Sequence, residues 1–255
     1  MISVTADFIP IGHHIVDATW VMPGRTEPLD GYLHGTQHSV DTDAIKALPI
    51  EDRVSKAAEI FGQAGIAGHS AVAVYDRAGL FSAPWIWWLL RSHGCNAALI
   101  EGWDSTTADF DPAAPVGFVS KDDPATMNAS REDVLSAIHT DTQIIDARPA
   151  ARFSGEAEEP RPGCRAGHIP GSINIPFPSL KSGRNFHEAD TLRALFSDKG
   201  VDLSRPIITS CGSGVTASGL AFALTRCGAP NVRVYQGSWA EWGMDATLPI
   251  ETGPA

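Results

Sequence analysis

The stretch from Pro206 to Gly228 contains the residues of this chain that are best suited to covalent chemistry. A β-rich run ends at Cys211, a glycine-spaced loop follows, and small and apolar residues then continue at helical spacing. This order predicts a strand, a tight turn and a helix, with Cys211 at the strand end and facing the helix N-terminus. Backbone N–H groups and the helix dipole favour a thiolate at such a place, and the thiolate is the form of cysteine that attacks.

The loop after Cys211 is predicted to form a cradle for an anion. Gly212 and Gly214 can adopt backbone angles that are closed to other residues, so that successive N–H groups converge on one point. The alternative is a buried structural cysteine, which is the default for an isolated Cys. The flanking glycines and the helix start favour the cradle, because an anion site at a helix N-terminus requires them.

The six residues Cys211-Gly-Ser-Gly-Val-Thr216 resemble the active-site loop of the rhodanese superfamily, in the spelling of its 3-mercaptopyruvate sulfurtransferases. Further matches run through most of the chain: Asp146-Ala-Arg148, Arg152-Phe-x-Gly155, Glu159-Pro-Arg161, Gly167-His-Ile-Pro-Gly171-Ser-Ile-Asn-Ile-Pro176 and Tyr235-Gln-Gly-Ser-Trp-Ala-Glu-Trp-Gly243. The resemblance implies an enzyme that moves sulfur from 3-mercaptopyruvate, through a persulfide on Cys211, to a thiol acceptor or cyanide, with release of pyruvate. The acceptor is expected to be a thioredoxin or a small thiol.

The same resemblance implies a role for each residue of the loop. The amides of Gly212, Gly214, Val215 and Thr216 are expected to bind the sulfur and stabilise the anionic persulfide. Ser213 is expected to donate a hydrogen bond or to relay a proton. The alternative for Ser213 is a serine that only caps the loop.

Arg152 and Arg161 are expected to bind the substrate, because the matching arginines of the resembling sulfurtransferases hold its carboxylate and carbonyl. They are predicted to lie in an irregular segment, Phe153 to Gly163, that is rich in Gly, Pro and Glu. The alternative is that both arginines pair at the surface with the nearby glutamates Glu156, Glu158 and Glu159. Asp146 with Arg148 is interpreted as a structural ion pair, and His168 as a hydrogen-bonded structural residue.

Two halves of the chain repeat each other. Val72-Ala-Val-Tyr-Asp76-Arg-Ala-Gly79 corresponds to Ile207-Ile-Thr-Ser-Cys211-Gly-Ser-Gly214 at a constant offset, which indicates a duplication. Short Val/Ile runs alternate with helical stretches in each half, so the fold class is α/β, with two tandem domains that each have a parallel sheet and helices on both faces. We place the domains at 1–115 and 129–255, with a linker at 116–128 that is rich in Pro, Gly and Asp. The first domain has Asp76 in place of Cys211 and is expected to be catalytically silent.

Composition limits the partners that this chain can have. The net charge is −11 and the isoelectric point is near 5.2, without a run of basic residues, which argues against nucleic acid or an anionic membrane as a partner. The four cysteines show neither Cys-x-x-Cys pairing nor Cys/His metal spacing, so we expect reduced thiols, no metal and no cofactor. The N-terminus lacks the pattern of a signal peptide, and a cytoplasmic location is expected.

Three other functions fit parts of the pattern. A thiosulfate sulfurtransferase is the nearest, but the resembling loop commonly has basic residues directly after the cysteine, where Gly212 and Ser213 stand. A cysteine phosphatase needs an arginine six residues after the cysteine to clamp the phosphoryl group, and position 217 is alanine. A non-enzymatic persulfide carrier or binding module would lack the cysteine or the substrate arginines, and both are present.

Overall fold

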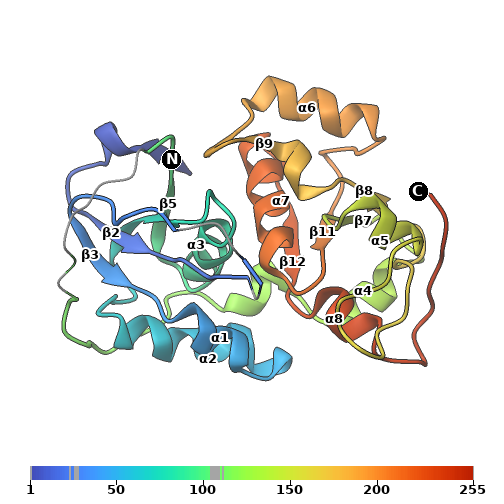
Figure 1. The fold of residues 1–255 in the computed structure, drawn as a ribbon, viewed down its shortest axis with the longest axis horizontal. Coiled ribbons are helices and arrows are strands. Elements are labelled where there is room, and N and C mark those ends of the chain that lie inside the picture. Colours follow the sequence, from blue (N-terminus) through green and yellow to red (C-terminus); the bar gives the residue numbers. More distant parts are fainter. Residues whose placement is uncertain (1, 23, 26–28, 104–109, 111, 255) are drawn as a thin grey trace. The chain divides into compact units, whose positions relative to one another are not determined.

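The computed structural model describes residues 2–22, 24–25, 29–103, 110 and 112–254 (Figure 1). The chain divides into two compact units. Unit 1 comprises Met1–Ala125 with Gly183–Asn185, and unit 2 comprises Thr126–Ser182 with Phe186–Ala255. The last residue of the predicted linker, Asn128, lies in a strand of unit 2.

Unit 1 is built on a five-stranded parallel sheet with the order β1-β5-β4-β2-β3. Its elements are β1 (Ser3–Thr5), η1 (Ala6–Phe8), β2 (His13–Asp17), β3 (Thr36–Ser39), α1 (Thr42–Ala47), α2 (Ile50–Gln63), β4 (Ala71–Tyr75), α3 (Ala83–Ser92), β5 (Asn96–Glu101) and the short η2 (Pro124–Met127) that leads into unit 2. Helix α3 packs on β4 and β5 and is almost entirely buried, including Trp85, Trp87 and Trp88. These tryptophans are therefore core residues.

Unit 2 is built on a second five-stranded parallel sheet, with the order β6-β12-β11-β7-β8. Its elements are β6 (Asn128–Ala129), α4 (Arg131–Ala137), β7 (Gln143–Asp146), α5 (Ala150–Ser154), β8 (Ile173–Asn174), η3 (Phe177–Leu180), β9 (Lys181–Ser182), α6 (Ala189–Asp198), β11 (Ile207–Ser210), α7 (Val215–Arg226), β12 (Val232–Tyr235) and α8 (Ser238–Trp242). The short strand β10 (Asn185–Phe186) pairs with β9 and begins at the last residue of the segment that belongs to unit 1. Helices α6 and α7 lie on one face of the sheet, and α4, α5 and α8 lie on the other (Figure 1). The predicted α/β fold with helices on both faces is confirmed here.

The duplication predicted from the sequence is visible in the two sheets. Strands β4 and β11 occupy the same central place in the two strand orders. Asp76 follows β4, and Cys211 follows β11. Gly79 and Gly214 both have left-handed backbone angles, with φ of +80° and +89°. The two loops therefore descend from one strand–turn–helix unit.

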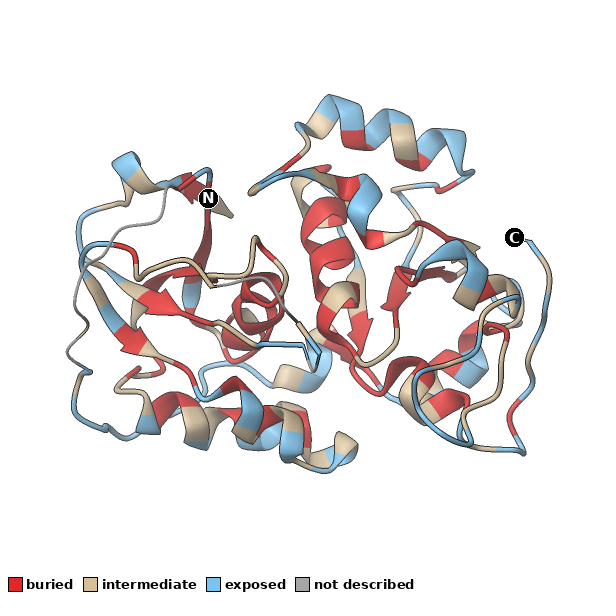
Figure 2. Ribbon diagram, viewed as in Figure 1, coloured by how far each residue is buried: buried red, intermediate tan, exposed pale blue. Residues whose placement is uncertain are grey.

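The core of unit 2 fixes the loop that follows β11. Helix α7 is buried from Ala217 to Leu224, because its residues there are small or apolar (Figure 2). A Cβ atom on Gly219 would lie 2.3 Å from the Phe177 ring, so glycine is needed for this close packing. On the opposite face, Ile208 belongs to an apolar cluster with Trp239 and Trp242 of α8. Side chains on both faces of the sheet therefore pack against the strand and the helix that flank Cys211.

Candidate functional site

The predicted strand, turn and helix at Cys211 are confirmed. Strand β11 ends at Ser210, and α7 begins at Val215 after a four-residue turn. Val215 and Thr216 are the first two residues of α7, so their backbone N–H groups lie in the turn of the helix that lacks intrahelical partners.

The sulfur of Cys211 is held by hydrogen-bond donors. The backbone N–H of Gly214 donates to Sγ at 3.1 Å, and the N–H of Ser213 donates to it at 3.4 Å. The residue is buried, with 2% of its surface exposed. Donors that point at a sulfur stabilise negative charge on it, so these two contacts are what the prediction of an anion cradle requires.

The thiols of the three other cysteines are each made less acidic by their surroundings. Burial raises the pKa of the Cys95 thiol to about 11. Burial also raises the pKa of the Cys164 and Cys227 thiols above the ordinary value. These cysteines therefore remain protonated at neutral pH and are poor nucleophiles.

The two glycines of the loop have different purposes. Gly214 has the left-handed conformation, and a Cβ atom there would lie 2.7 Å from the Gln236 carbonyl oxygen. Gly212 is not left-handed, so the expectation of unusual backbone angles is wrong at this position. A residue without a side chain is needed there because of a close contact: a Cβ atom on Gly212 would lie 3.2 Å from Nη2 of Arg152. Gly212 lets a guanidinium group approach the backbone of the cysteine loop.

Ser238 was not predicted as part of this site, yet it supports the loop from the start of α8, which follows the neighbouring strand β12. The Cys211 N–H donates to Ser238 Oγ at 3.1 Å, and Oγ also lies 3.9 Å from Cys211 Sγ. Ser238 has φ of +51°, a conformation that costs a residue other than glycine energy. Directly after it, the N–H groups of Trp239 and Ala240 donate to the carbonyls of Cys211 and Gly212, each at 2.9 Å.

Arg152 lies against the cysteine loop, as its contact with Gly212 shows. It belongs to α5, so the expectation that it lies in irregular chain is wrong, as it is for Phe153 and Ser154. Its guanidinium donates from Nε and Nη2 to the carboxylate of Glu159, at 3.1 and 2.5 Å. That carboxylate is 4% exposed, so this pair is not a surface ion pair.

Arg161 approaches the loop less directly. Its side chain is exposed, and its Nη1 lies 3.5 Å from the carbonyl oxygen of Ala240. The N–H of Ala240 in turn donates to the carbonyl of Gly212. Within the described residues, neither arginine is ion-paired with Glu156 or Glu158, the two exposed glutamates of this segment.

The structural roles predicted for Arg148 and His168 are confirmed. Arg148 is buried and donates from Nε and Nη2 to Asp146 at 2.7 to 3.2 Å. The Nδ1 of His168 lies 2.9 Å from the Phe153 carbonyl oxygen, and its ring stacks on the Phe153 ring. Both residues brace the segment that follows β7 and α5.

The corresponding loop of unit 1 is filled by its own side chain. Asp76 is fully buried, and its carboxylate accepts backbone N–H groups from Ala78, Leu80, Ser82 and Ala83 at 2.7 to 2.9 Å. A carboxylate thus occupies the centre of this cradle, where the donors of an anion site converge.

We expect the Asp76→Asn substitution to destabilise unit 1, because the amide NH₂ would face two of the four backbone donors. A buried donor left without an acceptor costs about 1–3 kcal/mol, so the free energy of unfolding should fall by at least about 2 kcal/mol. Thermal and urea unfolding measure the change. Asp7→Asn is the matched control, because Asp7 is exposed and loses the same charge. Equal stabilities for the two variants would contradict this role of Asp76.

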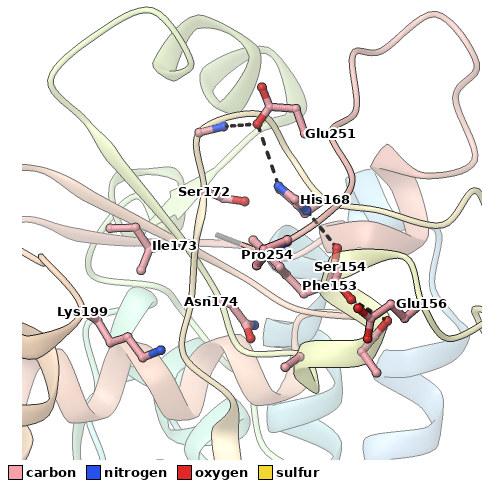
Figure 3. Close-up of a pocket in the computed structure, with 13 residues that line it drawn as sticks. Phe153, Ser154, Glu156, His168, Ser172, Ile173, Asn174, Lys199, Glu251 and Pro254 are labelled. Atoms are coloured by element: carbon pink, nitrogen blue, oxygen red, sulfur yellow. Dashed lines mark hydrogen bonds and ion pairs between the residues drawn. The ribbon is translucent and has the colours of Figure 1, made fainter.

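A cavity of about 610 Å³ lies in unit 2 (Figure 3). It is lined by α5, the turn before β8, Lys199 and the C-terminal residues Glu251 and Pro254. The described residues that line it include no residue of the Cys211 loop and neither Arg152 nor Arg161. We therefore do not assign the candidate active site to this cavity. The part of the chain that the structure describes contains no cluster of three or more His, Cys, Asp or Glu residues that could hold a metal ion. It also contains no helix of the length and apolarity that crossing a bilayer requires.

Comparison with known proteins identifies the family. Residues 130–245, which include Cys211 and both arginines, match the family model of the Rhodanese-like domain. The 3-mercaptopyruvate sulfurtransferase of Escherichia coli is 39% identical over 257 residues, covering 93% of this chain and 91% of that protein. The chain belongs to the rhodanese superfamily.

Two further relatives of this chain are informative. The thiosulfate sulfurtransferase of Bos taurus is 33% identical over 264 residues, covering 94% of this chain and 88% of that protein. The crystal structure of SseA from Escherichia coli, described as a 3-mercaptopyruvate sulfotransferase with the rhodanese fold, has a TM-score of 0.78 and 32% identity. It covers 93% of this chain and 98% of SseA. This member of the superfamily is therefore a sulfurtransferase, as the sequence predicted.

Proposed function

We propose that this protein transfers sulfur from 3-mercaptopyruvate to a thiol acceptor through a persulfide on Cys211. The observation that carries the proposal is the cradle itself: two backbone N–H groups point at the Cys211 sulfur, and the Arg152 guanidinium lies beside Gly212 of the same loop. A nucleophilic sulfur next to a carboxylate-binding group fits a small thiol that carries one carboxylate.

The first half-reaction forms the persulfide. The Cys211 thiolate attacks the sulfur of 3-mercaptopyruvate, the carbon–sulfur bond breaks, and its electron pair leaves on the enolate of pyruvate. The proton of the substrate thiol moves to the enolate carbon, so that pyruvate and an anionic persulfide are the products. Ser213, whose N–H already binds the Cys211 sulfur, is the residue we propose to relay this proton. The amides of Gly214, Val215 and Thr216 stabilise the persulfide, and Arg152 and Arg161 hold the carboxylate and carbonyl.

The second half-reaction transfers the persulfide sulfur from Cys211 to the acceptor. An acceptor thiolate attacks the terminal persulfide sulfur, the sulfur–sulfur bond breaks, and the Cys211 thiolate is restored. Cyanide would react in the same way and leave as thiocyanate. We propose a thioredoxin or a small thiol as the acceptor. Unit 1 takes no part in the covalent steps, because the carboxylate of Asp76 already binds the donors of its loop.

A steady-state comparison of 3-mercaptopyruvate and thiosulfate, with the same acceptor, tests the proposal. We expect kcat/KM to be at least about tenfold higher for 3-mercaptopyruvate, because the loop has no cation directly after Cys211 to offset the desolvation of a dianion. The alternative is a thiosulfate sulfurtransferase, the activity in the name of the Bos taurus relative. A tenfold preference for thiosulfate would establish that alternative.

A further inference from the structure

The carboxylate of Glu159 lies between two arginines of unit 2. It accepts from Nη1 of Arg148 at 2.8 Å and from Nε and Nη2 of Arg152. A buried carboxylate is costly to desolvate, and it is tolerated where donors satisfy its oxygens. Its neighbour Glu158 is exposed, so burial separates two adjacent residues of the same charge.

The contacts of Arg148 make it a fixed support for Glu159. Its other hydrogen-bonding groups bind Asp146 and the Gly167 carbonyl, and its guanidinium packs on the Trp239 ring at 4.4 Å. The Arg148 side chain is 1% exposed. Because Arg148 cannot move without breaking these contacts, the position of Glu159 is set by the core of unit 2.

Glu159 in turn fixes the orientation of the Arg152 guanidinium. The carboxylate binds one edge of the guanidinium, Nε and Nη2, and a bidentate contact of this kind fixes the plane of the group. The Nη1 atom has no hydrogen-bond partner among the described residues, and it lies 3.9 Å from a Cβ atom built on Gly212. Nη2, the atom that binds Glu159, lies nearer still, at 3.2 Å from the same Cβ position, so both Nη atoms are beside the cysteine loop and Nη1 is the one that has no partner there.

Glu159 also cancels most of the charge that Arg152 brings. Asp146 and Glu159 carry two negative charges, and Arg148 and Arg152 carry two positive charges, so the four side chains are neutral as a set. Arg161, whose Nη1 lies 3.5 Å from the Ala240 carbonyl oxygen, stands outside this neutral set. A neutral set of side chains gives less compensation to a dianion than an unpaired arginine would, so it suits a monoanion better.

We propose that Glu159 is a positioning residue that aims Arg152 at the substrate and, by neutralising it, selects sulfur donors with one negative charge over dianions. This inference rests on the proposed function, because it assumes that Arg152 binds the donor. It assigns to one buried carboxylate both the geometry and the charge preference of the donor site.

Two substitutions separate the two effects. Glu159→Gln keeps an acceptor oxygen but removes the charge, so kcat/KM for thiosulfate relative to 3-mercaptopyruvate should rise about tenfold, mainly through a lower KM for thiosulfate. Glu159→Asp keeps the charge but withdraws the carboxylate by one methylene, so kcat with 3-mercaptopyruvate should fall about tenfold while the donor ratio stays within about twofold of wild type. Glu158→Gln is the control for loss of a nearby exposed charge and should match wild type.

The outcomes are distinct for this inference and for the proposed function. Wild type that turns over no 3-mercaptopyruvate overturns both. If wild type turns over 3-mercaptopyruvate, the variants decide. Equal ratios of kcat/KM for thiosulfate to kcat/KM for 3-mercaptopyruvate in Glu159→Gln and Glu158→Gln would overturn the charge selection alone. If thermal unfolding shows that Glu159→Gln does not fold, Glu159→Asp decides: unchanged kcat and KM for both donors would overturn the positioning role.

Discussion

The Cys211→Ser variant is expected to take up no sulfur from any donor. A serine hydroxyl is not ionised near neutral pH, so it cannot replace the thiolate as the nucleophile. Stability should change little, because the hydroxyl can still accept the N–H groups of Ser213 and Gly214. Intact mass after incubation with 3-mercaptopyruvate measures the result: wild type should gain about 32 Da, the mass of one sulfur atom, and the variant nothing.

Cys164→Ser is the matched control for this experiment. Cys164 is the one partly exposed cysteine, and burial raises the pKa of its thiol. The control should therefore load sulfur as wild type does. Uptake of sulfur by Cys211→Ser, on Cys95, Cys164 or Cys227, would show that the nucleophile has been assigned to the wrong residue.

Replacement of either Arg152 or Arg161 by alanine should lower kcat/KM for 3-mercaptopyruvate by about 10–150-fold. Each change removes a charge-assisted hydrogen bond to the substrate, worth about 1.5–3 kcal/mol. Lysine at either position should restore only part of the activity, because a point charge attracts a carboxylate without orienting it. Steady-state kinetics with 3-mercaptopyruvate, for both alanine and both lysine variants, measure these effects.

The two arginines should differ in stability. Arg152→Ala leaves the buried Glu159 carboxylate with Arg148 as its remaining arginine partner, so its Tm should fall, whereas Arg161 is exposed and its loss should leave Tm near that of wild type. Arg205→Ala controls for the loss of a surface arginine, since Arg205 pairs with the exposed Asp141. If both alanine variants keep kcat/KM within about twofold of wild type, the arginines do not bind the donor.

Much of the site could be predicted from the sequence because its central part is contiguous. A strand end, a cysteine, a glycine-spaced turn and a helix start follow one another between Ile207 and Thr216, and local backbone preferences are enough to arrange them. The duplication was equally readable, because the offset between Asp76 and Cys211 is kept by the neighbouring glycines. The sequence alone therefore determined the fold class and the unequal character of the two loops, and it predicted Cys211 as the nucleophile.

The tertiary structure decided the contacts between segments that are distant along the chain. Ser238 stands 27 residues from Cys211, and only the pairing of β11 with β12 brings its hydroxyl to the loop. Glu159 has the same residue type as the exposed Glu158, and it differs in that the folded chain places its carboxylate between Arg148, which packs on Trp239, and Arg152. The sequence does not predict that the Arg152 guanidinium fills the space beside Gly212. These features depend on tertiary contacts between side chains on the sheet and on the helices that cover it. Local preferences along the chain do not predict such contacts.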